Sequence, residues 1–181
     1  MSREGVRRVT VTGSESTGKT WLAQRLARRF ETVWVPEFAR EYLVHKAAPL
    51  DASDVEPIAR GQMHSEDAVL RRARDLVILD TDLVSTVVYA KHYYGTCPAW
   101  VEHAARKRLA DLYLLCDIDL PWVADAARDR PEARHETHAA FADHLERYGA
   151  HYALVRGAWE QREAAAVTAI EALLASTLGH A

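Results

Sequence analysis

A glycine-rich octapeptide near the start of the chain constrains the fold more than any other sequence feature. It occupies residues 13–20 and matches the pattern G-x-x-x-x-G-K-[ST] at every fixed position. A Val- and Thr-rich run over residues 6–12 favours a strand before it, and the apolar spacing over residues 19–30 favours a helix after it. In that context the octapeptide predicts a loop whose backbone amides surround a phosphate group. The alternative is a glycine turn that fits the pattern by chance.

The residues of this loop have separate predicted roles in holding a nucleotide. Gly13 and Gly18 permit the backbone angles that such a loop needs. Lys19 can reach the β- and γ-phosphates, and the Thr20 hydroxyl suits a Mg²⁺ ion. The predicted ATP-binding residues of the loop are Gly13, Ser14, Glu15, Ser16, Thr17, Gly18, Lys19 and Thr20. We therefore expect ATP as co-substrate together with Mg²⁺, and no dinucleotide, because no G-x-G-x-x-G pattern occurs.

Short β-branched runs alternate with longer amphipathic segments along the rest of the chain. Further strands are predicted over residues 32–35, 76–79, 112–116 and 152–155. Helices are predicted from Ser53 toward Arg74, over residues 82–94 with Gly95 as the C-cap, and along the closing segment, where Val167, Ile170, Leu174 and Leu178 share one stripe. This alternation predicts a three-layer α/β fold of the P-loop NTPase type, with a five-stranded parallel sheet and helices on both faces. No linker is visible, so one domain over residues 1–181 is expected.

The composition excludes some classes of binding partner for such a domain. The net charge is −3, which argues against general nucleic-acid binding. No apolar run reaches the roughly 18 residues that cross a membrane. The two cysteines form no disulfide framework, so the cytoplasm is the expected location. A homo-oligomer is compatible with the sequence.

An acidic residue follows the second predicted strand. Glu37 comes two residues after Val35, and ligands of open α/β sheets bind at the carboxyl ends of strands. Glu37 is therefore well placed to accept a hydroxyl proton or to orient that hydroxyl. The alternative is a first-turn acid favoured by the helix dipole. Arg40 could orient Glu37 or contact phosphate, or form an ion pair with Glu37 or Glu41.

Two aspartates follow the third predicted strand. Asp80 ends the apolar run of residues 76–79, and an acid at the end of a buried strand beside a P-loop is typical of the Mg²⁺ side of the site. Asp80 is therefore predicted to hold Mg²⁺, through a water molecule. Asp82 could bond the hydroxyls of a substrate, or it could cap the helix that follows.

An arginine-rich segment follows the fourth predicted strand. Arg128, Arg130 and Arg134 crowd around Pro131 within a candidate lid over residues 122–135. Arginines on a mobile segment at this place could close over the ATP phosphates and stabilise the transferring group. We predict this catalytic and ATP-binding role for Arg128 and Arg130. The alternative is a solvated helix face on which nearby acids balance the arginines.

Five segments along the chain together form a specific ordered pattern. They are the octapeptide at 13–20, Val-Pro-Glu-Phe-Ala-Arg-Glu-Tyr at 35–42, Asp-Thr-Asp at 80–82, Tyr-Tyr-Gly-Thr-Cys-Pro-Ala-Trp at 93–100 and Asp-Ile-Asp-Leu-Pro-Trp-Val-Ala-Asp at 117–125. In this order they resemble the nicotinamide riboside kinase domain of NadR-type NAD-salvage proteins, over about residues 7–163. The resemblance implies a nucleoside-kinase-like fold and ATP-dependent phosphorylation of the ribose 5′-hydroxyl of nicotinamide riboside, which gives nicotinamide mononucleotide.

The resemblance also bears on single residues. The Val-Pro-Glu segment is similar to one in deoxynucleoside kinases, whose glutamate at this place serves as base, and this role carries over to Glu37. Bifunctional family members have an adenylyltransferase domain before the kinase, and these 181 residues contain none, so the resemblance extends to the kinase step alone.

The implied substrate carries a planar pyridinium cation, which an aromatic face would attract. Tyr89 and Trp122 are the aromatic residues we expect to contact it, and core packing is the alternative for each. Other functions stay open at this point. One is a kinase for another nucleoside or small alcohol, and the other is a nucleotide-sensing ATPase switch with a protein partner. Against the switch, the sequence has no N-K-x-D motif and no L-S-G-G-Q motif.

Overall fold

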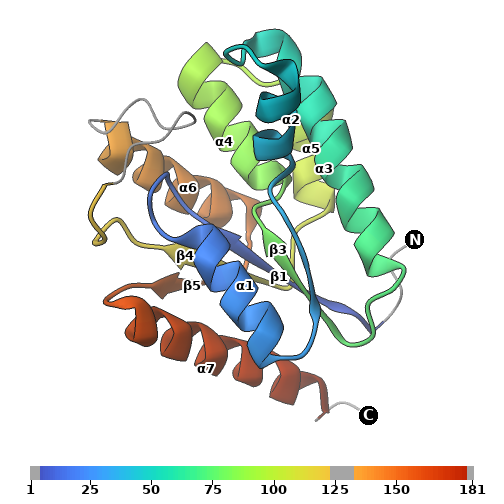
Figure 1. The fold of residues 1–181 in the computed structure, drawn as a ribbon, viewed down its shortest axis with the longest axis vertical. Helices are drawn as coiled ribbons and strands as arrows, with labels where there is room; N and C mark the ends of the chain where they lie inside the picture. The colour runs from blue at the N-terminus through green and yellow to red at the C-terminus, as the bar shows by residue number, and fades with distance from the viewer. Residues whose placement is uncertain (1–4, 123–132, 179–181) are drawn as a thin grey trace.

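The computed structural model describes residues 5–122 and 133–178, which form a five-stranded sheet and the helices around it (Figure 1). The strands are β1 (Arg7–Thr12), β2 (Val33–Val35), β3 (Leu76–Asp80), β4 (Leu112–Cys116) and β5 (Tyr152–Val155). They lie in the order β2-β3-β1-β4-β5, and every neighbouring pair is parallel. The predicted sheet is confirmed, and its strands lie within one residue of the predicted ranges.

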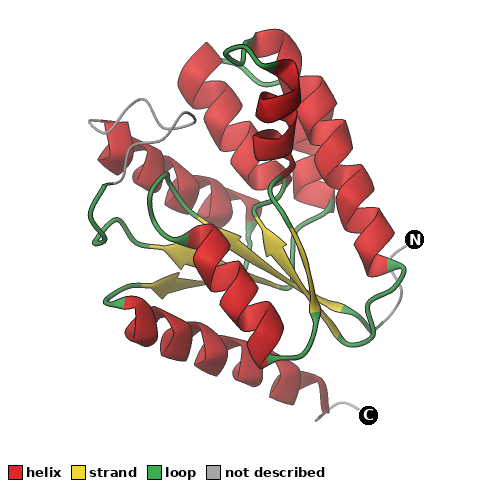
Figure 2. Ribbon diagram, in the orientation of Figure 1, coloured by secondary structure: helices red, strands yellow, loops and turns green. Residues whose placement is uncertain are grey.

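Helices cover both faces of the sheet, so the predicted three-layer fold is also confirmed (Figure 2). They are α1 (Lys19–Arg29), α2 (Phe38–Lys46), the short 3-10 helix η1 (Ala52–Asp54), α3 (Val55–Leu70), α4 (Leu83–Tyr94), α5 (Ala99–Lys107), α6 (Arg134–Tyr148) and α7 (Trp159–Leu178). Helices α1 and α7 share one core cluster, and α3 to α6 share another. Within the described ranges, none of these helices has the length and apolarity that crossing a membrane requires.

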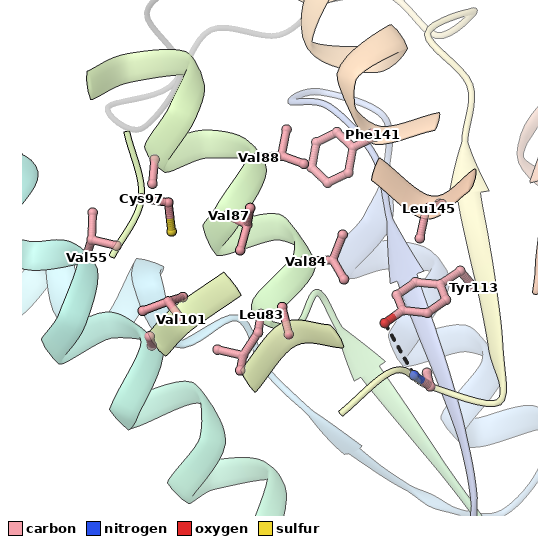
Figure 3. Close-up of a cluster of buried hydrophobic side chains, with 14 of the residues drawn as sticks. Val55, Leu83, Val84, Val87, Val88, Cys97, Val101, Tyr113, Phe141 and Leu145 are labelled. Atoms are coloured by element: carbon pink, nitrogen blue, oxygen red, sulfur yellow. Dashed lines mark hydrogen bonds between the residues drawn. The ribbon is translucent and has the colours of Figure 1, made fainter. Parts of the chain in front are cut away.

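The central strands alternate their side chains between these two clusters. In β4, Tyr113 and Leu115 pack with α4 and α6, whereas Leu112 and Leu114 pack with α1 and α7. Every residue of β3 and β4 is buried, as expected for strands covered on both faces. Figure 3 shows Tyr113 beside Val84 of α4 and Leu145 of α6, with Phe141 next to Val88.

The order of the strands fixes where a ligand can bind. Strand β1 lies between β3 and β4. The connection after β1 runs to β2 on one side of the sheet, and the connection after β4 runs to β5 on the other side. The loops after β1 and β4 therefore separate above the sheet and leave a crevice at its carboxyl edge. The octapeptide at 13–20 follows β1 and lies at this point.

The helical segment before β3 differs from the sequence-based expectation. The helix predicted from Ser53 is instead η1 followed by α3, and Asp51 rather than Ser53 is the cap. The Asp51 side chain accepts a hydrogen bond from the Ser53 backbone amide, and the Asp54 carboxylate accepts one from the Asp51 amide. These reciprocal bonds hold the turn before α3, and they depend on two acids three residues apart.

Asp82 caps α4, which settles one of the two roles left open for it. Its Oδ1 accepts a hydrogen bond from the Val84 amide at 2.9 Å, and its Oδ2 accepts one from the Tyr113 hydroxyl at 2.6 Å. The Tyr113 oxygen in turn accepts from the Ala110 amide at 3.3 Å (Figure 3). Burial raises the pKa of Asp82, while the hydrogen bond from Tyr113 lowers it. The structure thus gives Asp82 the capping role, with both carboxylate oxygens engaged inside the protein, and its substrate role stays a prediction.

Replacing Asp82 by Ala should therefore destabilise the fold. The change removes a helix cap and leaves the buried Tyr113 hydroxyl without an acceptor, a combined loss of about 2–4 kcal/mol. Urea unfolding measures the difference from the wild type. The exposed acid Asp143 supplies the control, and Asp143→Ala should change the free energy of unfolding by less than about 0.5 kcal/mol. Equal effects of the two changes would contradict the capping role.

Candidate active site

The loop after β1 has the backbone shape of an anion-binding turn. Gly13 has φ 130°, Ser16 has φ 56° and Gly18 has φ 80°. A Cβ atom on Gly13 would lie 2.8 Å from the Cys116 carbonyl oxygen, and one on Gly18 would lie 2.5 Å from the ring of Trp159. A side chain at either position would therefore clash with a neighbouring segment, and both positions also have backbone angles that favour glycine.

Two side chains of the loop bind its own backbone. The Lys19 ammonium donates to the Ser14 carbonyl oxygen at 2.8 Å, and the Thr17 hydroxyl donates to the same oxygen at 2.8 Å. Lys19 is only 8% exposed, so its charge lies within the loop rather than in solvent. A cation and the N-terminus of α1 thus converge on the space that the loop encloses.

Asp80 lies next to this loop, at the end of β3. Its carboxylate is buried near the Thr20 hydroxyl, and its Oδ1 has no hydrogen-bond partner in the described part of the chain. Burial and the nearby Glu37 raise the pKa of Asp80, and Thr20 and Lys19 lower it. A hydroxyl, a carboxylate with a free oxygen and phosphate oxygens are the ligands that Mg²⁺ prefers. The residues that were predicted to hold Mg²⁺ thus fit that ion.

A cavity of about 400 Å³ opens beside the loop, and we call it the strand-end cavity. Lys19 and Glu15 line it from the loop, Glu37 and Arg40 line it from the segment after β2, and Tyr89 lines it from α4. The Arg40 Nε donates to the Glu37 Oε2 at 2.9 Å. The sequence left Arg40 with several partners, and the structure gives it Glu37. Lys19 of the phosphate loop and the Glu37 carboxylate therefore line the same cavity.

Carboxylates outnumber cations along the wall of this cavity. Its acidic residues are Glu15, Glu37, Asp51 and Asp54, against Lys19 and Arg40. The buried Asp54 accepts hydrogen bonds from Lys46 and from the Tyr42 hydroxyl, which keep the pKa of its carboxyl low against the effect of burial. Lys46 pairs with Asp51 as well as with Asp54, so the surplus is one carboxylate, which favours a neutral or cationic ligand over an anionic one.

The remaining predicted site residues fall in different places. Tyr89 lines the strand-end cavity and lies 6.2 Å from Tyr93, ring centre to ring centre. Trp122 lines a small neighbouring hollow, together with Glu15 and Tyr93, and Arg134 lies over its ring at 5.9 Å. Arg128 and Arg130 lie outside the described residues, so the lid remains a prediction.

Two arginines that the sequence reasoning did not assign support the phosphate loop. Arg134 donates to the Ser16 carbonyl oxygen at 2.9 Å and to the Leu120 carbonyl oxygen at 2.7 Å. Arg162 is 1% exposed, and it donates to backbone oxygens of the loop and of the segments after β4 and β5, and to the Asp119 side chain. Burial lowers the pKa of both guanidinium groups. No local pattern marks Arg162, because its partners lie up to 145 positions away in the sequence.

Comparison with known proteins places the chain in a family. A family model described as an AAA domain matches residues 8–162, which contain the loop, Glu37, β2 to β5 and all of β1 except Arg7. The chain belongs to this AAA domain family. The AAA domain described here is also similar to the trifunctional NAD biosynthesis/regulator protein NadR of Escherichia coli (strain K12) and of Salmonella typhimurium (strain LT2). It is 33% identical to each over 127 residues, which make up 68% of this chain and 31% of the relative.

Solved structures of NadR are also similar to this chain. A crystal structure of NadR in complex with NAD and AMP-PNP has a TM-score of 0.81 and 27% identity, and covers 94% of this chain and 50% of that one. A structure of NadR in complex with NR has a TM-score of 0.77 and 26% identity, with coverage of 96% and 51%. A thymidylate kinase from Ehrlichia chaffeensis, 16% identical with a TM-score of 0.68, shares the fold. The AAA domain is therefore homologous to part of NadR, which confirms the predicted family resemblance, and it spans about a third of the curated relatives.

The buried Asp80 carboxylate should destabilise the metal-free protein. Its folded-state pKa lies above the unfolded value, so the unfolded state binds fewer protons and stability is lost as the pH rises from about 4 to about 7. Asp80→Asn removes the charge and should raise the free energy of unfolding by about 1–3 kcal/mol at pH 8, and by less at pH 5. Thermal unfolding in a chelator measures both values.

Asp75→Asn is the matched control, because Asp75 precedes the same strand and is exposed. It should leave stability nearly unchanged at both pH values. A gain for Asp80→Asn that does not depend on pH would contradict the assignment of an ionised, partly unpartnered carboxylate.

Proposed function

We propose that the protein transfers the γ-phosphoryl group of ATP to the 5′-hydroxyl of nicotinamide riboside and so forms nicotinamide mononucleotide. The observation that carries this proposal is that Lys19 of the phosphate loop and the Glu37 carboxylate line one cavity. Homology to NadR, one structure of which is a complex with NR and another a complex with AMP-PNP, supports the choice of both substrates.

The residues of the site supply what phosphoryl transfer requires. The loop amides and Lys19 bind the β- and γ-phosphates of ATP, and Lys19 neutralises charge as the transferring group moves. Thr20 and Asp80 would hold Mg²⁺, which when bound neutralises the phosphate oxygens. Thr20 follows the loop and Asp80 ends β3, whereas Glu37 follows β2, so the donor and the acceptor bind to different segments.

Glu37 acts on the acceptor. Its carboxylate accepts a hydrogen bond from the ribose 5′-hydroxyl and directs that oxygen at the γ-phosphorus. As the new O–P bond forms, the bond between the γ-phosphorus and the β,γ-bridging oxygen breaks and ADP leaves. The hydroxyl proton passes to Glu37 late in this step. Arg40, paired with the same carboxylate, fixes its orientation.

The charge of the strand-end cavity supports a nicotinamide nucleoside. Four carboxylates against Lys19, Arg40 and Lys46 leave a small negative excess, which favours the positive pyridinium ring, and the aromatic Tyr89 lines the cavity from α4. The same charge disfavours an acceptor that already carries a phosphate, because Lys19 is needed by ATP and Arg40 is paired with Glu37. A nucleoside thus fits the cavity better than a nucleoside monophosphate.

The function is tested by measuring ADP release with a panel of acceptors. The panel contains nicotinamide riboside, nicotinic acid riboside, the common nucleosides, thymidine monophosphate and thiamine. We expect the highest kcat/KM with nicotinamide riboside, at least about tenfold above nicotinic acid riboside, whose added carboxylate meets an acidic wall. ADP release that no acceptor stimulates, together with nucleotide-dependent binding of a protein, would support a switch instead.

Glu37→Gln keeps the shape of the side chain but cannot take the proton. Turnover should fall by about 10²–10⁴ while the KM for ATP stays near the wild-type value, because the phosphate loop is untouched. Glu41→Gln is the control, since Glu41 is an exposed acid of the same helix. A Glu37→Gln variant that turns over at the rate of Glu41→Gln would remove Glu37 from the reaction.

A further inference from the structure

Helix α2 carries Glu37 at its N-cap and Arg40 in its first turn, yet it has little apolar anchoring. None of its residues is buried, and the Glu37 side chain makes no capping hydrogen bond. Helices of this length depend on tertiary contacts for their stability. The start of α2 must therefore be held by another element, or the Glu37 carboxylate would have no fixed position.

Helix α3 supplies that contact through two adjacent residues. The Phe38 backbone amide donates to the Gln62 side-chain oxygen at 3.0 Å, which satisfies a free amide of the first turn of α2. The Phe38 ring lies over Gly61, where a Cβ atom would come within 2.1 Å of the ring. A glycine within a helix costs about 1 kcal/mol relative to Ala, and here it makes room for an aromatic ring.

The other end of the Gln62 amide reaches the neighbouring strand end. Its Nε2 donates to the Glu66 Oε1 at 3.0 Å and to the Thr81 carbonyl oxygen at 3.4 Å. Thr81 follows Asp80 directly and has φ 67°, an unfavourable angle for a β-branched residue. One side chain, 3% exposed, thus joins the segment after β2 to the segment after β3.

Glu66 fixes which way the amide points. Because a carboxylate accepts hydrogen bonds, the Nε2 group must face Glu66 and the oxygen must face Phe38. Arg108 donates to the other Glu66 oxygen at 3.3 Å and holds the carboxylate in place. The side-chain oxygen of Gln62 and both of its amide hydrogens are then engaged within the protein, and no donor remains for a ligand in the cavity that Gln62 lines.

We infer that Gln62, with Gly61, is a positioning residue that holds the Glu37 carboxylate in the strand-end cavity. In most helices the N-cap side chain accepts a backbone amide of its own first turn. Here Gln62 takes over the role of acceptor, and the Glu37 carboxylate stays available for the hydroxyl of the substrate. The effect on catalysis rests on the proposed function, whereas the anchoring of α2 does not.

Gln62→Leu has nearly the same size and removes every hydrogen bond. We expect kcat to fall about 10–100-fold, as for a reacting group misplaced by about 1 Å, with the KM for ATP unchanged. Hydrogen–deuterium exchange of residues 38–42 should become faster at the same time. His64→Ala, an exposed site of α3, is the control and should match the wild type in both measurements.

Gln62→Glu separates positioning from loss of folding. The introduced carboxyl can still accept a hydrogen bond from the Phe38 amide. It must share a proton with Glu66, however, because two ionised carboxylates would repel each other. Burial and Asp82 raise the pKa of Glu66 to about 7, although Arg108 lowers it. The same Arg108 also donates a hydrogen bond to the Asp67 carboxylate. Activity relative to the wild type should therefore recover as the pH falls from about 8.5 to about 6, when one proton is shared and repulsion is relieved.

The outcomes decide between an anchor and a ligand. An unchanged kcat for Gln62→Leu, or a higher acceptor KM alone, would overturn the inference, as would a Gln62→Glu variant without pH-dependent recovery. Should the wild type phosphorylate no acceptor, the proposed function fails and the exchange measurement decides by itself. Faster exchange at residues 38–42 in Gln62→Leu then supports the anchor, and unchanged exchange overturns it.

Discussion

The buried carboxylate of Asp80 is the centre around which the rest of the site is arranged. It ends β3, the neighbour of β1. Burial and Glu37 raise its pKa, whereas Thr20 and Lys19 of the phosphate loop lower it. An ionised group in such a place is tolerated only when cations and hydrogen-bond donors compensate it. The parallel sheet supplies this arrangement, because it brings the carboxyl ends of β1, β2 and β3 to one edge.

This arrangement explains why the fold and the proposed chemistry are linked. The phosphate loop needs the close approach of Gly13 to β4, and the acid on the acceptor side needs α2 to begin directly after β2. The strand-end cavity is lined from both sides, by Lys19 of the loop and by Glu37 before α2. In the proposed reaction, the loop binds ATP and the segment after β2 binds the acceptor, so the two substrates contact different sides of one cavity.

Much of this could be predicted from the sequence because the signals are local. The octapeptide at 13–20 and the apolar run before Asp80 mark strand ends within a few residues, and the alternation of elements gives the parallel sheet. The places of Lys19 and Asp80 follow from those local signals. Glu37 is found the same way, since it comes two residues after the end of β2.

What the sequence missed depends on contacts between distant segments. The sequence did not show that Asp82 accepts a hydrogen bond from the hydroxyl of Tyr113, which lies 31 positions later. Arg162 and Gln62 carry no motif, and their roles depend on backbone oxygens and amides that only the folded chain brings to them. Helix α2 was not predicted as an element because its residues show no buried stripe.

The most direct test of the account is a crystal structure with nicotinamide riboside and a non-hydrolysable analogue of MgATP. The account predicts the triphosphate within the loop at residues 13–20, and the ribose 5′-oxygen within hydrogen-bonding distance of the Glu37 carboxylate and in line with the γ-phosphorus. A nucleoside bound outside the strand-end cavity, or a Glu37 side chain turned away from its 5′-oxygen, would contradict it.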